Sequence, residues 1–266
     1  GLVHIAFRRG DQPHARIIRI DCSVASEMPG VVAVFTSDDL DRMTNPFRAT
    51  SRMKDYRSTE ISGLARGKVR YVGEAIAAVV ATSRYLAEDA LAHIDVELEP
   101  LAAIVDPERS AAEDAPILHE EMPSNVLAQR TFARGDAEAA IADAAVRVSG
   151  RFRFRRKTAV AMEARACVAE YDRRERSLTL YSSTQVPGIV RDALAEILDM
   201  PGHRLRVVAA DVGGGFGAKA SFYPEEIVVP ALARELGRPV GWTSDRTEDL
   251  MSTSQAFDEI VDAELA

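Results

Sequence analysis

The sequence predicts a mixed fold of the α+β or α/β class, in which helices alternate with the strands of mixed sheets. Its 266 residues are 47% hydrophobic, which is enough to bury one or two substantial cores. Short apolar runs of strand type recur along the chain, and many are followed by helix-like segments with capping residues. Clusters of Gly, Pro and Asp separate these segments, as turns do.

Residues 1–105 predict the first group of elements. Residues 15–21 have a period of two, and residues 31–35 and 75–81 are continuous apolar runs typical of buried strands. Ser83 is expected to cap a helix over 84–92. The other elements expected here are a strand at 2–7, a helix at 23–27, a helix capped near Ser37, a polar surface loop over 45–66 and a strand at 93–98.

The segment 106–125 is rich in Pro, Ala and acidic residues, which favours a linker between two domains. An extended arm wrapped over the neighbouring domain fits the same composition. We therefore expect a domain over 1–105, a linker over 106–125 and a second, incomplete domain over 126–266.

The second domain predicts a β-α-β-loop-α-β succession after an initial helix and strand. In the strand over 146–154, basic residues alternate with Phe152 and Phe154, which indicates a strand with one solvated face; a basic groove for a phosphate or acidic substrate is the alternative. The further elements expected are a helix at 137–144, strands at 167–171 and 177–181, a helix at 188–198, a strand at 204–209, a helix at 224–236, and strands at 239–243 and 259–265.

The segment 211–219, Asp-Val-Gly-Gly-Gly-Phe-Gly-Ala-Lys, is the most informative stretch of the chain. Glycine weakens regular structure, so four glycines within five residues require positive φ angles or a close approach of the backbone to a ligand. A surface hairpin turn would explain one or two of them, but not the embedded Phe216 or the preceding apolar strand. We interpret the segment as a cofactor loop.

Two common glycine motifs compare poorly with this loop. Ala220 after Lys219 breaks the Walker spacing. Gly213, Gly215 and Ala218 fit the dinucleotide fingerprint, but the next helix is expected to begin at Pro224, too late for its N-terminus to face a pyrophosphate. A nicotinamide-dependent dehydrogenase of the Rossmann type, with Asp245 on a ribose hydroxyl, therefore remains a minor alternative.

Composition and residue placement exclude several classes of protein. The net charge of −8 and the pI near 5.3 argue against a nucleic-acid partner, and no apolar run is long enough for a transmembrane segment. Cys22 and Cys167 fit no metal-ligand spacing and predict buried thiols in a reducing, cytoplasmic compartment. The scattered histidines predict no metal held by protein side chains. Because both ends lie in strand-like sequence, we expect a fragment or one piece of a split subunit.

With these segments in order, the chain resembles the molybdenum-binding large subunit of the molybdenum hydroxylases, the xanthine dehydrogenase and aldehyde oxidase family. The resemblance covers nearly the whole chain. Tyr71-Val72-Gly73-Glu74, with the apolar strand after it, and Val96-Glu97-Leu98-Glu99-Pro100-Leu101 resemble the family's α/β hammerhead domain. The motifs that resemble the start of its molybdopterin-binding domain are Met162-Glu163-Ala164-Arg165, Ser182-Ser183-Thr184-Gln185, Asp211 to Lys219 and Tyr223-Pro224-Glu225-Glu226.

The resemblance implies an oxidoreductase with a molybdopterin cofactor that holds the molybdenum, often in the cytosine dinucleotide form. Such an enzyme oxidises an aldehyde carbon or a carbon of an N-heterocycle with oxygen derived from water. Electrons then pass to 2Fe-2S clusters and FAD on partner domains or subunits. The backbone of Gly214, Gly215, Phe216 and Gly217 is then expected to face the cofactor, with N–H groups as donors. Gln185 matches the glutamine near the metal's oxo ligand; read from the residues alone, it is an ordinary turn amide.

Several positions depart from the family pattern. The general-base glutamate belongs to the remaining half of the molybdenum domain, in the same gene or a split subunit, so this piece is expected to be inactive alone. Ala220 stands where purine-oxidising members carry a carboxylate, which disfavours a purine substrate. Ala164 replaces a proline and Ala159 a histidine. A non-catalytic relative or assembly module is therefore the main alternative.

Overall fold

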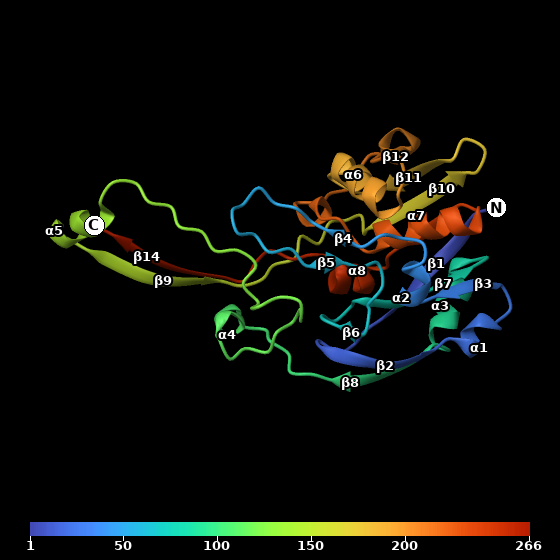
Figure 1. The fold of residues 1–266 in the computed structure, drawn as a ribbon, viewed down its shortest axis with the longest axis horizontal. Coiled ribbons are helices and arrows are strands. Elements are labelled where there is room, and N and C mark those ends of the chain that lie inside the picture. Colours follow the sequence, from blue (N-terminus) through green and yellow to red (C-terminus); the bar gives the residue numbers. More distant parts are fainter. The chain divides into compact units, whose positions relative to one another are not determined.

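A computed structural model describes all of residues 1–266, and the chain divides into two compact units (Figure 1). The larger unit comprises residues 1–49, 60–103 and 159–254, and the smaller comprises 50–59, 104–158 and 255–266. Each unit is thus assembled from segments distant in sequence.

The larger unit is built on a seven-stranded mixed sheet with the order β12-β11-β10-β13-β1-β7-β3. The pairs β1–β13 and β11–β12 are parallel, and the other neighbours are antiparallel. The strands are β1 (Val3–Arg9), β3 (Val31–Phe35), β7 (Ala75–Ala81), β10 (Ala166–Asp172), β11 (Ser177–Ser182), β12 (Leu205–Val208) and β13 (Val240–Thr243).

Strand β7 explains why its sequence is a continuous apolar run. Every residue of β7 is buried, and successive side chains enter different clusters. Ala78 and Val80 belong to the cluster that contains residues of helix α7 (Glu225–Leu236), whereas Ala77 and Val79 pack with Ala87 and Ala90 of helix α3 (Arg84–Leu91). Because side chains alternate across a strand, a strand covered on both faces needs apolar residues at every position.

Helices cover the sheet and connect its strands. Helix α7 (Glu225–Leu236) packs on β10, β11 and β13, and α3 (Arg84–Leu91) packs on β1 and β7. Pro224 stands at the N-cap of α7, close to its predicted start, and Ser83 caps α3 as predicted. The remaining helical elements are α1 (Ser23–Ser26), α2 (Ser37–Leu40), α6 (Pro187–Ile197), η1 (Gly202–Arg204), η2 (Ala218–Ala220) and α8 (Arg246–Ser252).

Two smaller sheets complete this unit. The strands β6 (Lys68–Val69), β2 (Ala15–Asp21) and β8 (Asp95–Pro100) pair in that order, and β4 (Phe47–Arg48) pairs with β5 (Glu60–Ile61). The helix expected near Ser37 is found, and its cap lies one residue earlier: α2 is capped by Thr36, whose side chain and backbone N–H both contact the Asp39 carboxylate.

The smaller unit contains α4 (Pro107–Ala111), α5 (Ala137–Asp143) and the antiparallel pair β9 (Val148–Phe154) and β14 (Glu259–Leu265). The prediction of one solvated face for β9 was wrong, because six of its seven residues are exposed. The basic-groove alternative also fails for two of its arginines: Arg151 pairs with Glu108, and Arg153 pairs with Asp106 and Asp258.

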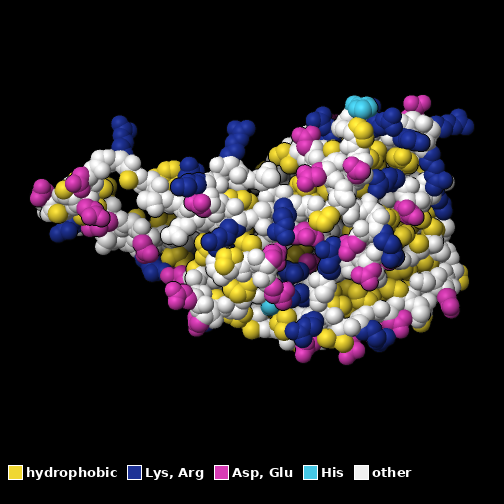
Figure 2. All heavy atoms as spheres, in the orientation of Figure 1, with side chains coloured by type: hydrophobic (Ala, Val, Ile, Leu, Met, Phe, Trp, Pro, Cys, Tyr) yellow, Lys and Arg dark blue, Asp and Glu magenta, His cyan; other side chains and the backbone are white.

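Surface features are consistent with a mixed charge distribution. On the face drawn in Figure 2, acidic and basic side chains are interspersed, and no continuous basic surface is visible. None of the helices combines the length and apolar character that a membrane span requires.

Candidate cofactor-binding site

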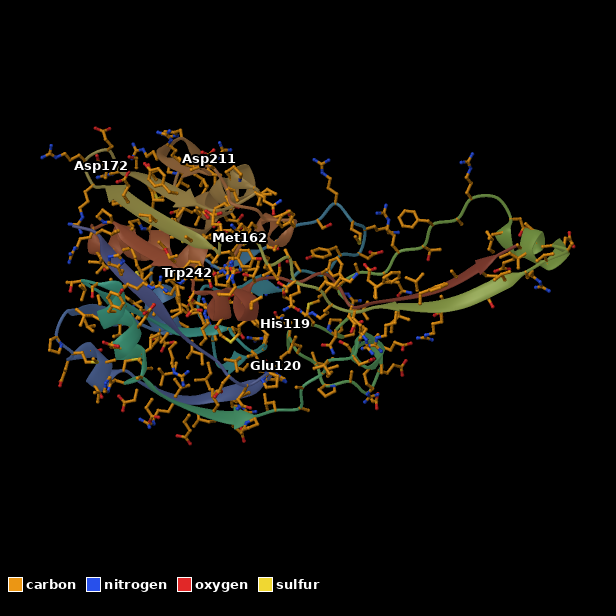
Figure 3. The ribbon with its side chains drawn as sticks, turned by 180° about the vertical axis from the view of Figure 1, so that it is seen from behind. His119, Glu120, Met162, Asp172, Asp211 and Trp242 are labelled. Atoms are coloured by element: carbon orange, nitrogen blue, oxygen red, sulfur yellow. The ribbon has the colours of Figure 1, made fainter.

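The glycine loop lies between β12 and the short helix η2, and positive φ angles shape it. Gly214 has φ of 95° and Gly217 has φ of 90°. Phe216, between them, has φ of 50°, which is uncommon for a residue with a side chain, and the residue is 80% exposed. The backbone thus turns sharply at three positions and holds the Phe216 ring away from the core. Asp211, at the start of the loop, is labelled in Figure 3.

Gln185, which follows β11, binds the far end of this loop. Its Oε1 atom accepts hydrogen bonds from the N–H groups of Gly217 (3.1 Å) and Lys219 (3.2 Å), and its backbone N–H donates to the carbonyl of Lys219 (2.8 Å). The side chain is therefore oriented by its oxygen. Its Nε2 amide group has no hydrogen-bond partner within the chain, so it is available as a donor.

Two of the glycines are required because side chains lie against them. A Cβ atom on Gly215 would lie 2.4 Å from Oε1 of Gln185, and one on Gly213 would lie 2.6 Å from Cβ of Glu163. Both distances are shorter than real Cβ contacts. Close approach to other side chains thus explains these two glycines, whereas positive φ explains Gly214 and Gly217.

Glu163 is the site residue to which the sequence assigned no role. Its Oε2 atom accepts hydrogen bonds from the N–H of Gly213 (2.8 Å) and from Nζ of Lys219 (2.6 Å). Burial alone would raise the pKa of this carboxyl, but the hydrogen bonds from Lys219 and Gly213 outweigh burial and lower the pKa. Met162, the neighbour of Glu163, is labelled in Figure 3.

The loop leaves particular backbone donors free. Gly214 donates to the carbonyl of Val212 and Gly217 donates to Gln185, so both N–H groups are already used. The N–H groups of Gly215 and Phe216 have no partner within the chain, although Gly215 is buried. Buried N–H groups are almost always paired in folded proteins. Together with Nε2 of Gln185, these donors suit a bound group that carries several oxygen acceptors.

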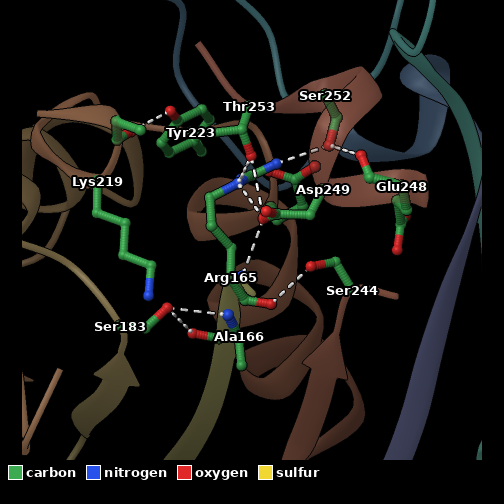
Figure 4. Close-up of polar contacts among 12 residues, drawn as sticks. Arg165, Ala166, Ser183, Lys219, Tyr223, Ser244, Glu248, Asp249, Ser252 and Thr253 are labelled. Atoms are coloured by element: carbon green, nitrogen blue, oxygen red, sulfur yellow. Dashed lines mark hydrogen bonds and ion pairs between the residues drawn. The ribbon is translucent and has the colours of Figure 1, made fainter. Parts of the chain in front are cut away.

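A buried polar network surrounds Arg165, next to Tyr223, as Figure 4 shows. Arg165 donates to Glu225 (2.7 Å), to Thr253 (2.7 Å) and to Ser252 (2.8 Å), and its guanidinium carbon lies 3.8 Å from the centre of the Tyr223 ring. The other carboxylate oxygen of Glu225 accepts from Arg9 at 2.6 Å. Two arginines therefore neutralise one buried glutamate.

Tyr223 connects this network to the loop. Its hydroxyl donates to the carbonyl of Ala218, at the end of the loop, and accepts from the N–H of Ser254 at 3.0 Å. The neighbouring cavity of about 10 Å³ is lined by Lys219, Ser183 and Glu226 among others, and it has room for roughly one water molecule. It is too small to be a substrate pocket.

No group of three or more His, Cys, Asp or Glu residues is placed to hold a metal ion, and both cysteines are free thiols. The free donors around the loop suit an organic group that carries oxygen acceptors.

Two family models together match almost the whole chain. Residues 118–266 match the molybdopterin cofactor-binding domain, and residues 1–102 match the α/β hammerhead domain of aldehyde oxidase and xanthine dehydrogenase. The chain belongs to the molybdenum hydroxylase family, in the class of its molybdopterin-binding large subunits.

Individual relatives agree with this assignment. The nicotine 6-hydroxylase large subunit of Paenarthrobacter nicotinovorans is 38% identical over 100% of this chain and 32% of its own length. A carbon monoxide dehydrogenase large chain from Hydrogenophaga pseudoflava is 32% identical over 100% of this chain and 34% of its own. The chain therefore spans about a third of the length of these relatives.

The fold matches solved structures equally well. Quinoline 2-oxidoreductase from Pseudomonas putida 86 superposes with a TM-score of 0.94 at 38% identity, over 100% of this chain and 34% of that one. The predicted mixed fold with a hammerhead domain is thereby confirmed.

Proposed function

We propose that this chain is part of a molybdenum-dependent hydroxylase or dehydrogenase that oxidises an aldehyde carbon or a carbon of an N-heterocycle. The observation that carries the proposal is the set of free donors, Gly215 N–H, Phe216 N–H and Gln185 Nε2, on a loop within a matched molybdopterin cofactor-binding domain. When bound, the molybdenum cofactor supplies the two-electron oxidation with oxygen derived from water.

The protein residues bind and orient this group. Gly215 and Phe216 donate hydrogen bonds to its oxygen atoms without loss of side-chain entropy, as the donors of an oxyanion hole do. Gln185 adds a third donor, because two loop N–H groups bind its Oε1 and its Nε2 has no partner within the chain. Gly214 and Gly217 keep the loop in the conformation that exposes these donors, through their positive φ angles.

Similarity to named relatives favours an N-heterocycle as substrate. The nicotine and quinoline enzymes are each 38% identical to this chain, and both are named for N-heterocycles. Carbon monoxide dehydrogenase large chains match at a lower identity of 32–34%. Ala220 supplies no carboxylate for a purine.

The complete assembly is proposed to include further components. Several relatives are named as large subunits or as one subunit of a complex, which supports partners that carry 2Fe-2S clusters and FAD. We further propose the cytosine dinucleotide form of the cofactor, a cytoplasmic location, and a division into a hammerhead domain (1–105), a linker (106–125) and a cofactor-binding part (126–266).

Metal and pterin analysis of the intact assembly tests the proposal. We expect about one molybdenum and one pterin for each copy of this chain. An assembly that contains neither, after expression with molybdate, would favour a non-catalytic module that kept the fold.

A further inference from the structure

Glu163 and Gly213 are linked by a pair of hydrogen bonds in opposite directions. The N–H of Glu163 donates to the carbonyl of Gly213 at 3.2 Å, and the carboxylate of Glu163 accepts from the N–H of Gly213 at 2.8 Å. Gly213 must lack a side chain here, because its Cβ would collide with Cβ of Glu163. One residue therefore fixes the entrance of the glycine loop.

The same carboxylate oxygen also holds the exit of the loop. Nζ of Lys219 lies 2.6 Å from Oε2 of Glu163, and the lysine side chain is only 3% exposed. The backbone of Lys219 is bound on both sides by Gln185. A buried ammonium group is costly unless it is paired. Glu163 is the single ion-pair partner of Lys219, so a Lys219 side chain that moved away from it would lose the pairing of its charge.

The two free donors lie between these fixed points. Gly213 and Lys219 flank Gly215 and Phe216, whose N–H groups have no partner in the chain. Without the carboxylate, the entrance and exit of the loop would no longer share a contact, and the direction of the intervening N–H groups would be held from one side only.

We propose that Glu163 is a positioning residue, which ties Gly213 to Lys219 and thereby sets the direction of the Gly215 and Phe216 N–H groups. For its consequence in cofactor binding, this inference rests on the proposed function. The printed contacts of its side chain are with the two ends of the loop, at Gly213 and Lys219.

Three variants separate the two contacts of the carboxylate. Glu163→Gln keeps an oxygen that can accept from Gly213 but removes the charge that pairs with Lys219. Glu163→Ala removes both contacts, and Lys219→Met removes only the ammonium. Glu175→Gln, in the exposed turn between β10 and β11, changes the same charge far from the loop and is the matched control.

Amide hydrogen exchange of the apo form of the complete protein is the direct readout. We expect exchange in peptides covering 211–220 to become about tenfold faster in Glu163→Ala, which corresponds to the loss of charge-assisted hydrogen bonds. Glu163→Gln and Lys219→Met should each give a smaller increase. Peptides covering β7 and the Glu175→Gln control should exchange as in the wild type.

Two outcomes would overturn the inference. One is unchanged exchange of 211–220 in both Glu163 variants; the other is an equal increase in the loop and in β7, which would show a general loss of stability. Retention of pterin and molybdenum by the same variants is measured separately. A wild-type protein without cofactor would contradict the proposed function, whereas the exchange result would still decide the role of Glu163.

Discussion

Arg165 and Glu225 form an ion pair of 2.7 Å in which the two side chains are only 5% and 1% exposed. Arg9 completes the arrangement on the other carboxylate oxygen. The pair joins the start of β10 to the first turn of α7, directly behind the glycine loop. Loss of this ion pair is therefore expected to destabilise the elements that support the loop.

The first prediction concerns acid stability. Burial alone would raise the pKa of Glu225, but Arg165 and Arg9 outweigh burial and hold the pKa at about 2. A carboxyl whose pKa is lower in the folded state stabilises the fold at pH values above the ordinary glutamate pKa. This stabilisation is lost as the pH falls toward 2. This linkage amounts to about 3 kcal/mol at neutral pH.

The free energy of unfolding in urea, measured for the wild type and for Glu225→Gln at several pH values, checks this prediction. At pH 7 we expect the variant to be less stable by about 3–5 kcal/mol, because two buried arginines lose their counter-charge. The difference should shrink below pH 4. A difference that stays constant from pH 7 to pH 3 would show that Glu225 is not the titrating group.

The second prediction concerns Glu74, which behaves in the opposite way. Burial raises the pKa of its carboxyl to about 7, and a hydrogen bond from the N–H of Arg70 only partly offsets it. The folded state therefore holds a proton that the unfolded state has released, so stability decreases as pH rises from about 4.5 through 7. Glu74→Gln should be more stable than the wild type by about 2–3 kcal/mol at pH 8 and by less than about 1 kcal/mol at pH 5. Thermal unfolding measures this, with Glu27→Gln, an exposed site, as control.

The third prediction compares two glycines. Gly215→Ala forces Gln185 away, because the new Cβ would lie 2.4 Å from its Oε1. We expect pterin to be released at least about tenfold faster, equivalent to the loss of roughly 1.4 kcal/mol of binding. Gly188→Ala, in the first turn of α6, meets no atom within 4 Å and should change stability by less than about 0.5 kcal/mol without affecting pterin release. Equal release rates in the two variants would contradict the assigned role of Gly215.

The fourth prediction concerns nicotinamide cofactors. The Rossmann alternative was wrong, since no α-helix begins at Ala218: η2 is a single 3₁₀ turn, and α7 begins only at Glu225. The carboxylate of Asp245 is used to cap α8, where it accepts from the N–H of Glu248 at 2.7 Å. Titration with NAD should therefore leave the fluorescence of Trp242 unchanged. A saturable change would reopen this alternative.

The sequence predicted the elements well where local rules decide them. The continuous apolar run of β7, the cap at Ser83 and the start of α7 follow from periodicity and capping, and each is found in the structure. The strand over 146–154 was predicted to bury one face, which fails because β9 pairs with β14 alone and no other element covers it.

The site was predictable only in part. The concentration of glycines marked the loop, and the family resemblance marked Gln185. Glu163 and Lys219 are separated by 56 positions, and Arg9 and Glu225 by 216. No local pattern reports such pairings, because they depend on how the sheet brings distant segments together.

The distance between the loop and the bound cofactor tests the central claim most directly. A structure of the complete, cofactor-loaded protein should place an oxygen atom of the molybdenum cofactor about 3 Å from the N–H nitrogen of Gly215 or Phe216. A structure in which this loop faces solvent, with the pterin bound elsewhere, would contradict the account.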